Sequence, residues 1–450
     1  TSLCERKNPK LRKLALVGVT ALVMFVGGFI AMRNSPLVTS SPVLSRFSSL
    51  SFSELKTQGR FFIWPMAIEG FKEKPILGWG QEGFSYVFNE HYNPKMYAQE
   101  QWFDRAHSMF LEWLIAGGLL GLLGFLSILF FAFWYLWKDE GSVFSSAEKS
   151  LLTGLLMAYI FQGFFVFDNL VGYIMFFSLI AFIHAMRGGN HIKMPSFIET
   201  PGSQQVVAAV VVVFFVTTTY FFTWIPLRAG QTLIGALRAV QAQDATTSLK
   251  LFKQALAYDS FGTPEILEQL VNAQGAFLNP KVPEEVRGQF ANLVREGYSA
   301  QFAKSPKDAR YYLFYAEFLR SVGLPDLAIE NFSKAQALSP QKQTITIQIG
   351  LTYLEQKNFP KALEYLKKAS DADPSYVQAK VYYGVAALYA NKTELANEVL
   401  GSIPTEILVN DEKVVQALAQ TARYPELIKI FTRRIAEGND TFQNSASLAV

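Results

Sequence analysis

Five long apolar stretches constrain the fold of this chain more than any other feature. A helix needs about 20 mainly apolar residues to cross a hydrocarbon core about 30 Å thick. Stretches of this kind occupy residues 14–32, 109–137, 150–167, 171–186 and 206–225. Half of all residues are hydrophobic and only 17% are charged, a balance too apolar for an ordinary soluble protein. We therefore predict a polytopic bundle of transmembrane helices.

Basic residues ahead of the first stretch predict the orientation of the chain in the membrane. These residues are Arg6, Lys7, Lys10, Arg12 and Lys13. Glu5 is the only acidic residue among them. Cytoplasmic segments carry an excess of lysine and arginine, so we place the N-terminus in the cytoplasm. Alternation then puts residues 33–106 and all of 229–450 outside it, in a multi-pass protein of the cell (inner) membrane. Because the chain opens at Thr1 and reaches an apolar stretch almost at once, we also expect further spans upstream.

Charge and cysteine content exclude other classes of protein. The 41 basic and 37 acidic residues leave a net charge of +4 without a basic cluster, so we predict no nucleic-acid partner. Cys4 is the only cysteine, which excludes an intrachain disulfide and a cysteine-rich metal site. The four histidines are His91, His107, His184 and His191. Their spacing is not that of metal ligands, so we predict neither a metal nor a cofactor.

The second half of the chain repeats itself with a period of 34 residues. Ala328, Phe332, Ala335 and Pro340 recur as Ala362, Leu366, Ala369 and Pro374, and Gly350 recurs as Gly384. A weaker copy contains Ala236, Ala239, Phe252 and Ala255. The pattern resembles tetratricopeptide repeats, whose helix pairs must stack to bury their apolar faces. We predict an all-α chain, with a membrane domain at 1–228 and an α-solenoid at 229–450 that binds a protein or a glycan, or else acts as a spacer.

The segment at 33–106 is longer than a connection between two spans requires, and long ordered loops are usually functional. Residues 60–71 suit a short helix that ends at the turn around Pro75. Gly78 and Gly80 indicate a tight turn directly after it.

The second apolar stretch, residues 109–137, is long for a single crossing. At 1.5 Å per residue it measures about 44 Å, so we expect it to tilt or to project from the membrane. Gly117 and Gly121 form a GxxxG pair, which predicts close packing against another helix.

Ionisable residues end the loop just before this stretch, namely Asp104, Arg105 and His107. Such groups are costly to place near lipid, which makes the cluster a functional-site candidate. The alternative is an interfacial anchor that is solvated by lipid headgroups.

Three motifs in this region resemble the O-antigen ligase and polymerase family of membrane glycosyltransferases. The resemblance covers roughly residues 10–190. It rests on Gly59-Arg60 through Trp64, on Pro75-Ile76-Leu77-Gly78-Trp79-Gly80-x-x-Gly83-Phe84, and on Ala106-His107-Ser108-x-x-Leu111-x-x-Leu114-x-x-x-Gly118-x-x-Gly121. Family members commonly carry asparagine where this chain has Ser108. A further family arginine, from an earlier outer loop, has no counterpart here.

The resemblance implies a GT-C-like fold and transfer of a glycan from a polyprenyl diphosphate carrier to an acceptor outside the cytoplasm. Arg60 is then the candidate diphosphate clamp and Arg105 a weaker one, because the guanidinium fork matches phosphate oxygens. His107 is the candidate base or acceptor-positioning group. Trp79, Trp102 and Tyr97 are candidates for stacking on sugar rings, or else interfacial aromatics.

The implied partners are membrane lipids, a polyprenyl diphosphate-linked glycan donor and a glycan or protein acceptor, with a further protein possible on the repeats. Two rival functions remain open. The first is a non-catalytic, membrane-anchored repeat scaffold for envelope assembly. The second is a translocase, which the lack of an internal trail of charges in the spans disfavours.

Overall fold

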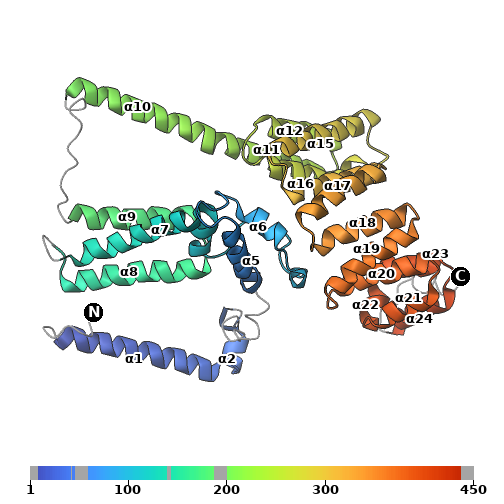
Figure 1. Cartoon of the computed structure of the whole chain (residues 1–450), viewed down its shortest axis with the longest axis horizontal. Coiled ribbons are helices and arrows are strands. Elements are labelled where there is room, and N and C mark those ends of the chain that lie inside the picture. The colour runs from blue at the N-terminus through green and yellow to red at the C-terminus, as the bar shows by residue number, and fades with distance from the viewer. Residues whose placement is uncertain (1–8, 42, 46–58, 139–142, 187–199, 437–450) are drawn as a thin grey trace. The chain divides into compact units, whose positions relative to one another are not determined.

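The computed structural model describes residues 9–41, 43–45, 59–138, 143–186 and 200–436, and every regular element in these ranges is a helix (Figure 1). The chain splits into two compact units. One comprises Thr1–His91 with Gln99–Lys193, and the other comprises Tyr92–Ala98 with Met194–Val450. The all-α prediction is confirmed, with apolar helices in the first unit and stacked helix pairs in the second.

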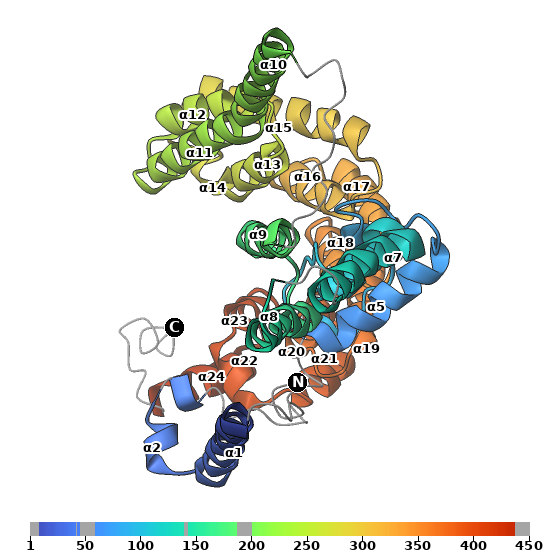
Figure 2. The same ribbon diagram turned by 90° about the vertical axis from the view of Figure 1, so that its left-hand side faces the viewer.

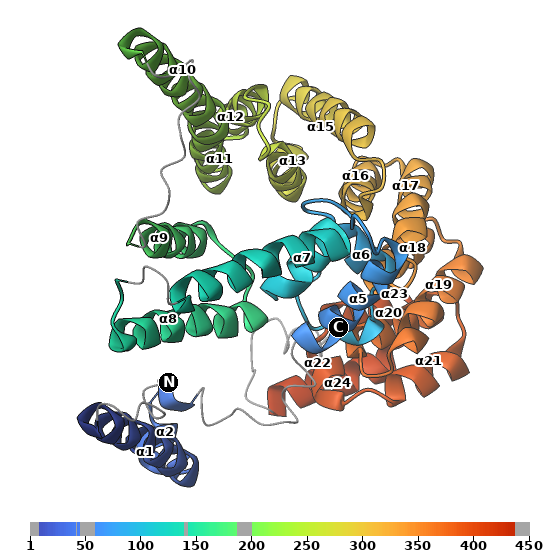
Figure 3. The same ribbon diagram turned by 60° about the vertical axis from the view of Figure 1, so that its left-hand side comes forward.

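The first unit is built around three apolar helices that lie side by side, α7, α8 and α9 (Figure 3). Its helices are α1 (Pro9–Met32), α2 (Pro36–Thr39), α5 (Gly59–Glu73), α6 (Phe84–Glu90), α7 (Met109–Trp137), α8 (Ser146–Phe165) and α9 (Leu170–Met186). Phe125, on α7, stacks on Trp113 with ring centroids 5.4 Å apart and is buried in the core of these helices. Their outward side chains, such as Phe131, Phe161 and Met175, are large, apolar and exposed, a surface that suits lipid rather than water.

All five apolar stretches of the sequence are helical. Two helices are long and apolar enough to cross a membrane, Met109–Trp137 and Pro201–Gln241. Leu16–Met32 and Leu170–Met186 are shorter apolar helices. The second long helix consists of α10 (Pro201–Thr219), the π-helical turn η3 (Tyr220–Trp224) and α11 (Ile225–Gln241), which follow one another in Figure 2. It leads directly into the repeats.

The remaining helices of the second unit form a solenoid of pairs. They are α12 (Ala245–Ala257), α13 (Thr263–Asn272), α14 (Gln274–Phe277), α15 (Glu284–Lys304), α16 (Ala309–Ser321), α17 (Pro325–Leu338), α18 (Gln343–Glu355), α19 (Phe359–Ala372), α20 (Val377–Tyr389), α21 (Thr393–Gly401), α22 (Thr405–Asn410), α23 (Glu412–Gln420) and α24 (Tyr424–Ala436), with the short 3-10 helix η1 (Pro94–Met96) from the loop. The densest packing joins α11 to α12, α16 to α17 and α18 to α19.

The 34-residue period corresponds to these pairs. The repeated small and large residues, including Ala328 and Ala362, are buried in α17 and α19. A Cβ atom on Gly350 would lie 2.6 Å from Cγ of Leu366, and one on Gly384 would clash with Leu400. The recurring glycine is therefore required because the two helices of each pair approach so closely.

Candidate functional site

Helix α5 positions Arg60 in its first turn. The helix confirms the one expected at 60–71 and extends to Glu73. It packs against α6, where Gly70 faces Val87 so closely that a Cβ atom on the glycine would clash with the valine side chain. Nε of Arg60 is buried and has no hydrogen-bond partner among the described residues. A buried, unpartnered guanidinium nitrogen is costly, which marks Arg60 as a candidate ligand-binding group.

The turn after α5 inserts its backbone into a break in α7. Gly118 leaves the helical conformation, with φ 60° and ψ −156°. The N–H of Trp79 donates to the carbonyl of Ile115 at 2.7 Å, and the N–H of Leu119 donates to the carbonyl of Pro75 at 2.8 Å. The turn therefore satisfies backbone groups that the break would otherwise leave unpaired.

This arrangement changes the interpretation of the glycines. The expected tight turn is present, with φ 68° at Gly78 and 87° at Gly80. Among the described residues no helix packs closely against Gly117, because a Cβ atom there would meet nothing within 4 Å, so its role in helix packing stays a prediction. The close approach is instead made by loop backbone at Gly118, where a Cβ atom would clash with the carbonyl of Ile76.

Trp79 holds this turn in place. Its indole Nε1 donates to the carbonyl of Gly70 at 2.7 Å, and Nζ of Lys74 lies 3.8 Å from the centre of its ring. These contacts fasten the turn to α5 on one side while its backbone pairs with α7 on the other. The structure thus gives Trp79 an architectural role, and its stacking on a sugar stays a prediction.

His107 stands just before α7 in a strained conformation. Its φ is 51°, which is uncommon for a residue with a side chain. Its ring packs edge-on against Phe103 and Phe167, with centroids 5.6 and 5.2 Å away. The N–H of Ala106 donates to the Glu112 carboxylate, which ties the irregular segment before the histidine to the first turn of α7. Strain of this kind persists only where neighbours fix the backbone, and it clusters at functional sites.

Arg60 and His107 influence each other electrostatically. Burial lowers the pKa of His107 below its ordinary value, and the positive charge of Arg60 lowers this pKa further. Glu100 and Asp104 act in the opposite direction. The histidine is therefore kept in its neutral, proton-accepting form near neutral pH. An arginine and a neutral histidine near one another can hold an anion and accept a proton.

A polar pocket of about 210 Å³ lies beside these residues. Phe167, which contacts His107, is part of its wall. The described residues that line it are Gln81, Arg105, Met109, Glu112, Trp113, Ala116, Phe167, Asp168, Asn169, Leu170 and Tyr173. Of the site residues predicted from the sequence, only Arg105 belongs to this lining. Arg60, His107, Trp79 and the half-buried Trp102 lie outside it.

Asp168 lines the same pocket as Arg105, which itself pairs with two carboxylates that the sequence did not single out. The guanidinium of Arg105 forms ion pairs with Glu82 at 2.6 Å and with Glu112 at 3.8 Å. Asp168 accepts a hydrogen bond from Tyr159 at 2.7 Å, while its second carboxylate oxygen is buried without a partner among the described residues. Burial also raises the pKa of Asp168. An acidic residue in an otherwise apolar stretch, as Glu112 is, was the available signal.

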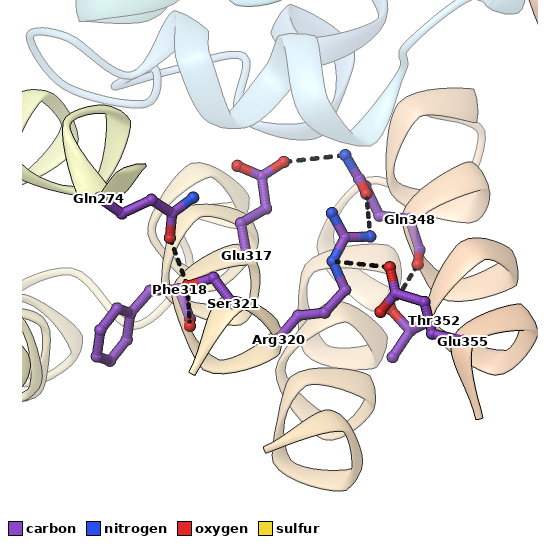
Figure 4. A network of polar contacts seen from close by, with 8 residues as sticks. All are labelled: Gln274, Glu317, Phe318, Arg320, Ser321, Gln348, Thr352 and Glu355. Carbon is purple, nitrogen blue, oxygen red and sulfur yellow. Dashed lines mark hydrogen bonds and ion pairs between the residues drawn. The ribbon is translucent and has the colours of Figure 1, made fainter. Parts of the chain in front are cut away.

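The repeats carry a second polar cluster, on the first helices of two consecutive pairs, α16 and α18 (Figure 4). Gln348 donates to Glu317 at 3.1 Å and accepts from Arg320 at 2.6 Å, so it bridges the two charges. Burial raises the pKa of Glu317. Glu355 extends the cluster with a carboxylate 4.0 Å from Nε of Arg320. Side chains of both signs thus alternate with amides along this face.

Comparison with known proteins relates both halves to known families. Residues 3–126 match the family model described as O-antigen ligase, and residues 347–399 match the tetratricopeptide repeat model. No curated protein matches the chain.

Several solved structures are similar at low identity. A tetratricopeptide repeat protein from Parabacteroides merdae is 12% identical, with a TM-score of 0.37 over 47% of this chain and 80% of that one. The pilF protein of Pseudomonas aeruginosa is 13% identical, with a TM-score of 0.33 over 50% of this chain and 99% of that one. PilW, a type IV pilus biogenesis factor, is 18% identical, with a TM-score of 0.34 over 49% of this chain and 98% of that one. By the two family models, residues 3–126 are similar to O-antigen ligases and residues 347–399 to tetratricopeptide repeats.

Proposed function

We propose that this protein is a membrane glycosyltransferase that moves a glycan from a polyprenyl diphosphate carrier to an acceptor hydroxyl outside the cytoplasm. The observation that carries the proposal is the O-antigen ligase match over residues 3–126, a range that contains both Arg60 and His107. The electrostatic coupling of these two side chains supports it. Residues 1–228 would form the membrane domain and residues 229–450 the extracytoplasmic repeat domain.

Arg60 is the proposed diphosphate clamp. In the reaction the acceptor oxygen bonds to the anomeric carbon, while the bond from that carbon to the diphosphate oxygen breaks. Negative charge then grows on the leaving polyprenyl diphosphate. Nε of Arg60 is buried and has no partner in the described parts of the chain, and the guanidinium is suited to meet this charge because its fork matches phosphate oxygens. Arg105, which already pairs with Glu82, is the weaker candidate.

His107 is the proposed base. It would accept the proton of the acceptor hydroxyl as the oxygen attacks, or hold that hydroxyl in position. Its lowered pKa keeps the imidazole neutral at physiological pH, which is the form that can accept a proton. Trp79 and Trp102 remain proposed stacking partners for the sugar.

The repeats are the proposed site for the acceptor or for a protein partner. The polar cluster around Glu317, Arg320 and Gln348 offers alternating donors and acceptors, which suits a peptide backbone or a glycan. The repeat match is also compatible with the rival function, a membrane-anchored scaffold without catalysis. The two functions differ in one respect that can be measured, because only an enzyme forms a new glycosidic bond.

Reconstitution tests the proposed activity. Full-length protein in liposomes, supplied with a polyprenyl diphosphate-linked glycan and a hydroxyl acceptor, is expected to release polyprenyl diphosphate and glycosylated acceptor in equal amounts. Addition of a chelator such as EDTA is expected to leave the rate unchanged, since the proposed chemistry requires only Arg60 and His107. A protein that incorporates correctly but forms no product with lipid, glycan or protein acceptors would support the scaffold instead.

Cysteine labelling tests the proposed topology. Single cysteines replace the exposed residues Glu90, Ala147 and Glu364 in a Cys4→Ser background. In spheroplasts, a membrane-impermeant maleimide is expected to label positions 90 and 364 but not 147, because the basic N-terminus directs alternate segments outward. Permeabilisation should expose position 147 and serves as the control. Labelling of position 147 together with protection of position 364 would show that the chain has the opposite orientation in the membrane.

A further inference from the structure

One short segment of the loop has its contacts in the repeats. Residues Tyr92–Ala98 lie between α6 and α7 in the sequence, yet they belong to the same compact unit as Met194–Val450. The loop therefore leaves the first unit at Tyr92 and returns to it at Gln99, because the residues up to His91 and from Gln99 belong to the first unit.

The segment is shaped by its own sequence. Asn93 caps a single 3-10 turn, η1, by accepting a hydrogen bond from the N–H of Lys95 at 3.0 Å. Pro94 occupies the first position of the turn, where its fixed φ is favourable and no donor is lost. The N–H of Met96 donates to the carbonyl of Asn93 at 2.9 Å. A segment stiffened in this way loses little conformational entropy when it docks.

Two of its side chains are almost completely buried. Tyr92 is 2% exposed and Met96 is 0% exposed. Burying a methionine side chain is favourable relative to leaving it exposed, so apolar contacts hold this segment in addition to its turn. Its neighbours Lys95 and Ala98 are exposed, which gives the segment one face toward protein and one toward solvent.

Its partners lie at the turns between consecutive repeats. The ring of Tyr97 stacks on Tyr376, with centroids 4.4 Å apart and an angle of 14° between the planes, and its hydroxyl donates to the carbonyl of Ser375 at 3.0 Å. At the preceding turn between repeats, the Gln343 side-chain amide donates to the carbonyl of Pro94 at 3.1 Å. These residues precede or begin α20 and α18, the first helices of two consecutive pairs.

Lys342 completes this surface. It is fully buried, and its Nζ lies 5.1 Å from the centre of the Tyr92 ring. Burial lowers its pKa to about 7, with Arg310 and Asp308 acting in opposite directions. Lys342 and Tyr376 are 34 residues apart, at the same position of consecutive repeats. The repeats thus contact both ends of the segment with side chains from equivalent turns.

We propose that the repeat edge formed by Lys342, Gln343, Ser375 and Tyr376 is a docking surface for the loop segment Tyr92–Ala98, and that docking there holds the loop in the conformation required for transfer. The second clause rests on the proposed function, since the same loop carries Arg60 and leads to His107. A ligand of the repeats that displaces the segment would then control transfer, with no contact to the reacting groups.

Hydrogen exchange of the full-length protein in detergent tests the docking. Tyr376→Ala is expected to speed exchange in a peptide covering residues 92–98 by about tenfold, because the lost stacking and apolar contact raise the population of the undocked segment. Tyr376→Phe keeps the ring and should exchange like wild type. Tyr353→Ala removes a tyrosine that packs on Tyr365 elsewhere in the repeats and is the matched control. Equal exchange in the Tyr376→Ala and Tyr353→Ala variants would overturn the docking surface.

A second pair of variants tests the consequence for transfer. Met96→Asp places a charge at a fully buried position and should release the segment, lowering kcat by about tenfold or more. Ala98→Asp introduces the same charge at an exposed position two residues later and should keep wild-type kcat. A released segment in Met96→Asp with unchanged kcat would overturn the coupling. If the wild-type protein transfers no glycan, the proposed function is contradicted. Hydrogen exchange would still test, independently of activity, whether the segment docks on the repeats.

Discussion

Replacement of His107 by alanine is expected to lower transfer by about 100- to 10,000-fold, the usual loss when a general base is removed. The variant should still insert and fold, because the half-buried imidazole makes edge-on contacts with Phe103 and Phe167 but does not fill the core. The measurement is the initial rate of product formation in the reconstituted system, together with the thermal melt in detergent. A scaffold would show no product in either protein.

Arg60→Ala is expected to lower the rate of transfer by a similar factor, because the leaving diphosphate would then face a half-buried site without its cation. Arg60→Lys should also be impaired, since an ammonium group cannot reproduce a bidentate contact with phosphate oxygens. Lys72→Ala is the matched control on the same helix, because this lysine is exposed and pairs with Glu69 at 2.7 Å. If both Arg60 variants retain wild-type rates, the assignment of the clamp is wrong.

The pH profile separates a catalytic histidine from one that only supports the loop. Since burial and Arg60 lower the pKa of His107, the neutral base persists below its ordinary value of about 6.5, and the acid limb of kcat/KM should fall below that pH. Asp104→Asn removes a carboxylate that raises this pKa, so the limb should move further toward acid. His91→Ala, in which the lost ring bonds to Glu73 at 2.6 Å, should leave the limb in place. An acid limb insensitive to Asp104→Asn would contradict the role of His107 as base.

The sequence predicts local structure better than contacts between distant segments. The repeats follow from a period of 34, because Ala328 and Ala362 are buried by helices that are close neighbours in the sequence. The docking of residues 92–98 could not be predicted, since Tyr97 and Tyr376 carry no pattern that relates them. The electrostatic effect of Arg60 on His107 could be expected only from the family resemblance, which implies that both belong to one site. Glu112 and Asp168 were missed because single acidic residues near apolar stretches do not reveal which pocket they line.

The break in α7 gives the clearest case of a contact hidden from the sequence. Glycines at 117, 118, 121 and 124 look equivalent in a helical pattern, and the GxxxG spacing singles out the first and third. The structure singles out Gly118 instead, because its conformation is open almost only to glycine and its Cα faces the carbonyl of Ile76. What distinguishes it is the loop at Pro75 to Gly80, about 40 residues earlier in the chain, whose backbone pairs with α7.

Gly118→Ala is therefore expected to destabilise the first unit by about 2–6 kcal/mol, the sum of backbone strain and overpacking against the Ile76 carbonyl. A loss of this size is a large fraction of the total stability of a typical domain, about 5–15 kcal/mol, so the yield of folded protein and its melting temperature in detergent should both fall sharply. Gly78→Ala should behave alike, since its φ is also positive and its Cβ atom would clash with the carbonyl of Ile115. Gly117→Ala is the matched control, because a Cβ atom there has open space and alanine favours the helix. A Gly117→Ala variant that melts lower than Gly118→Ala would restore the GxxxG interpretation and refute the paired break.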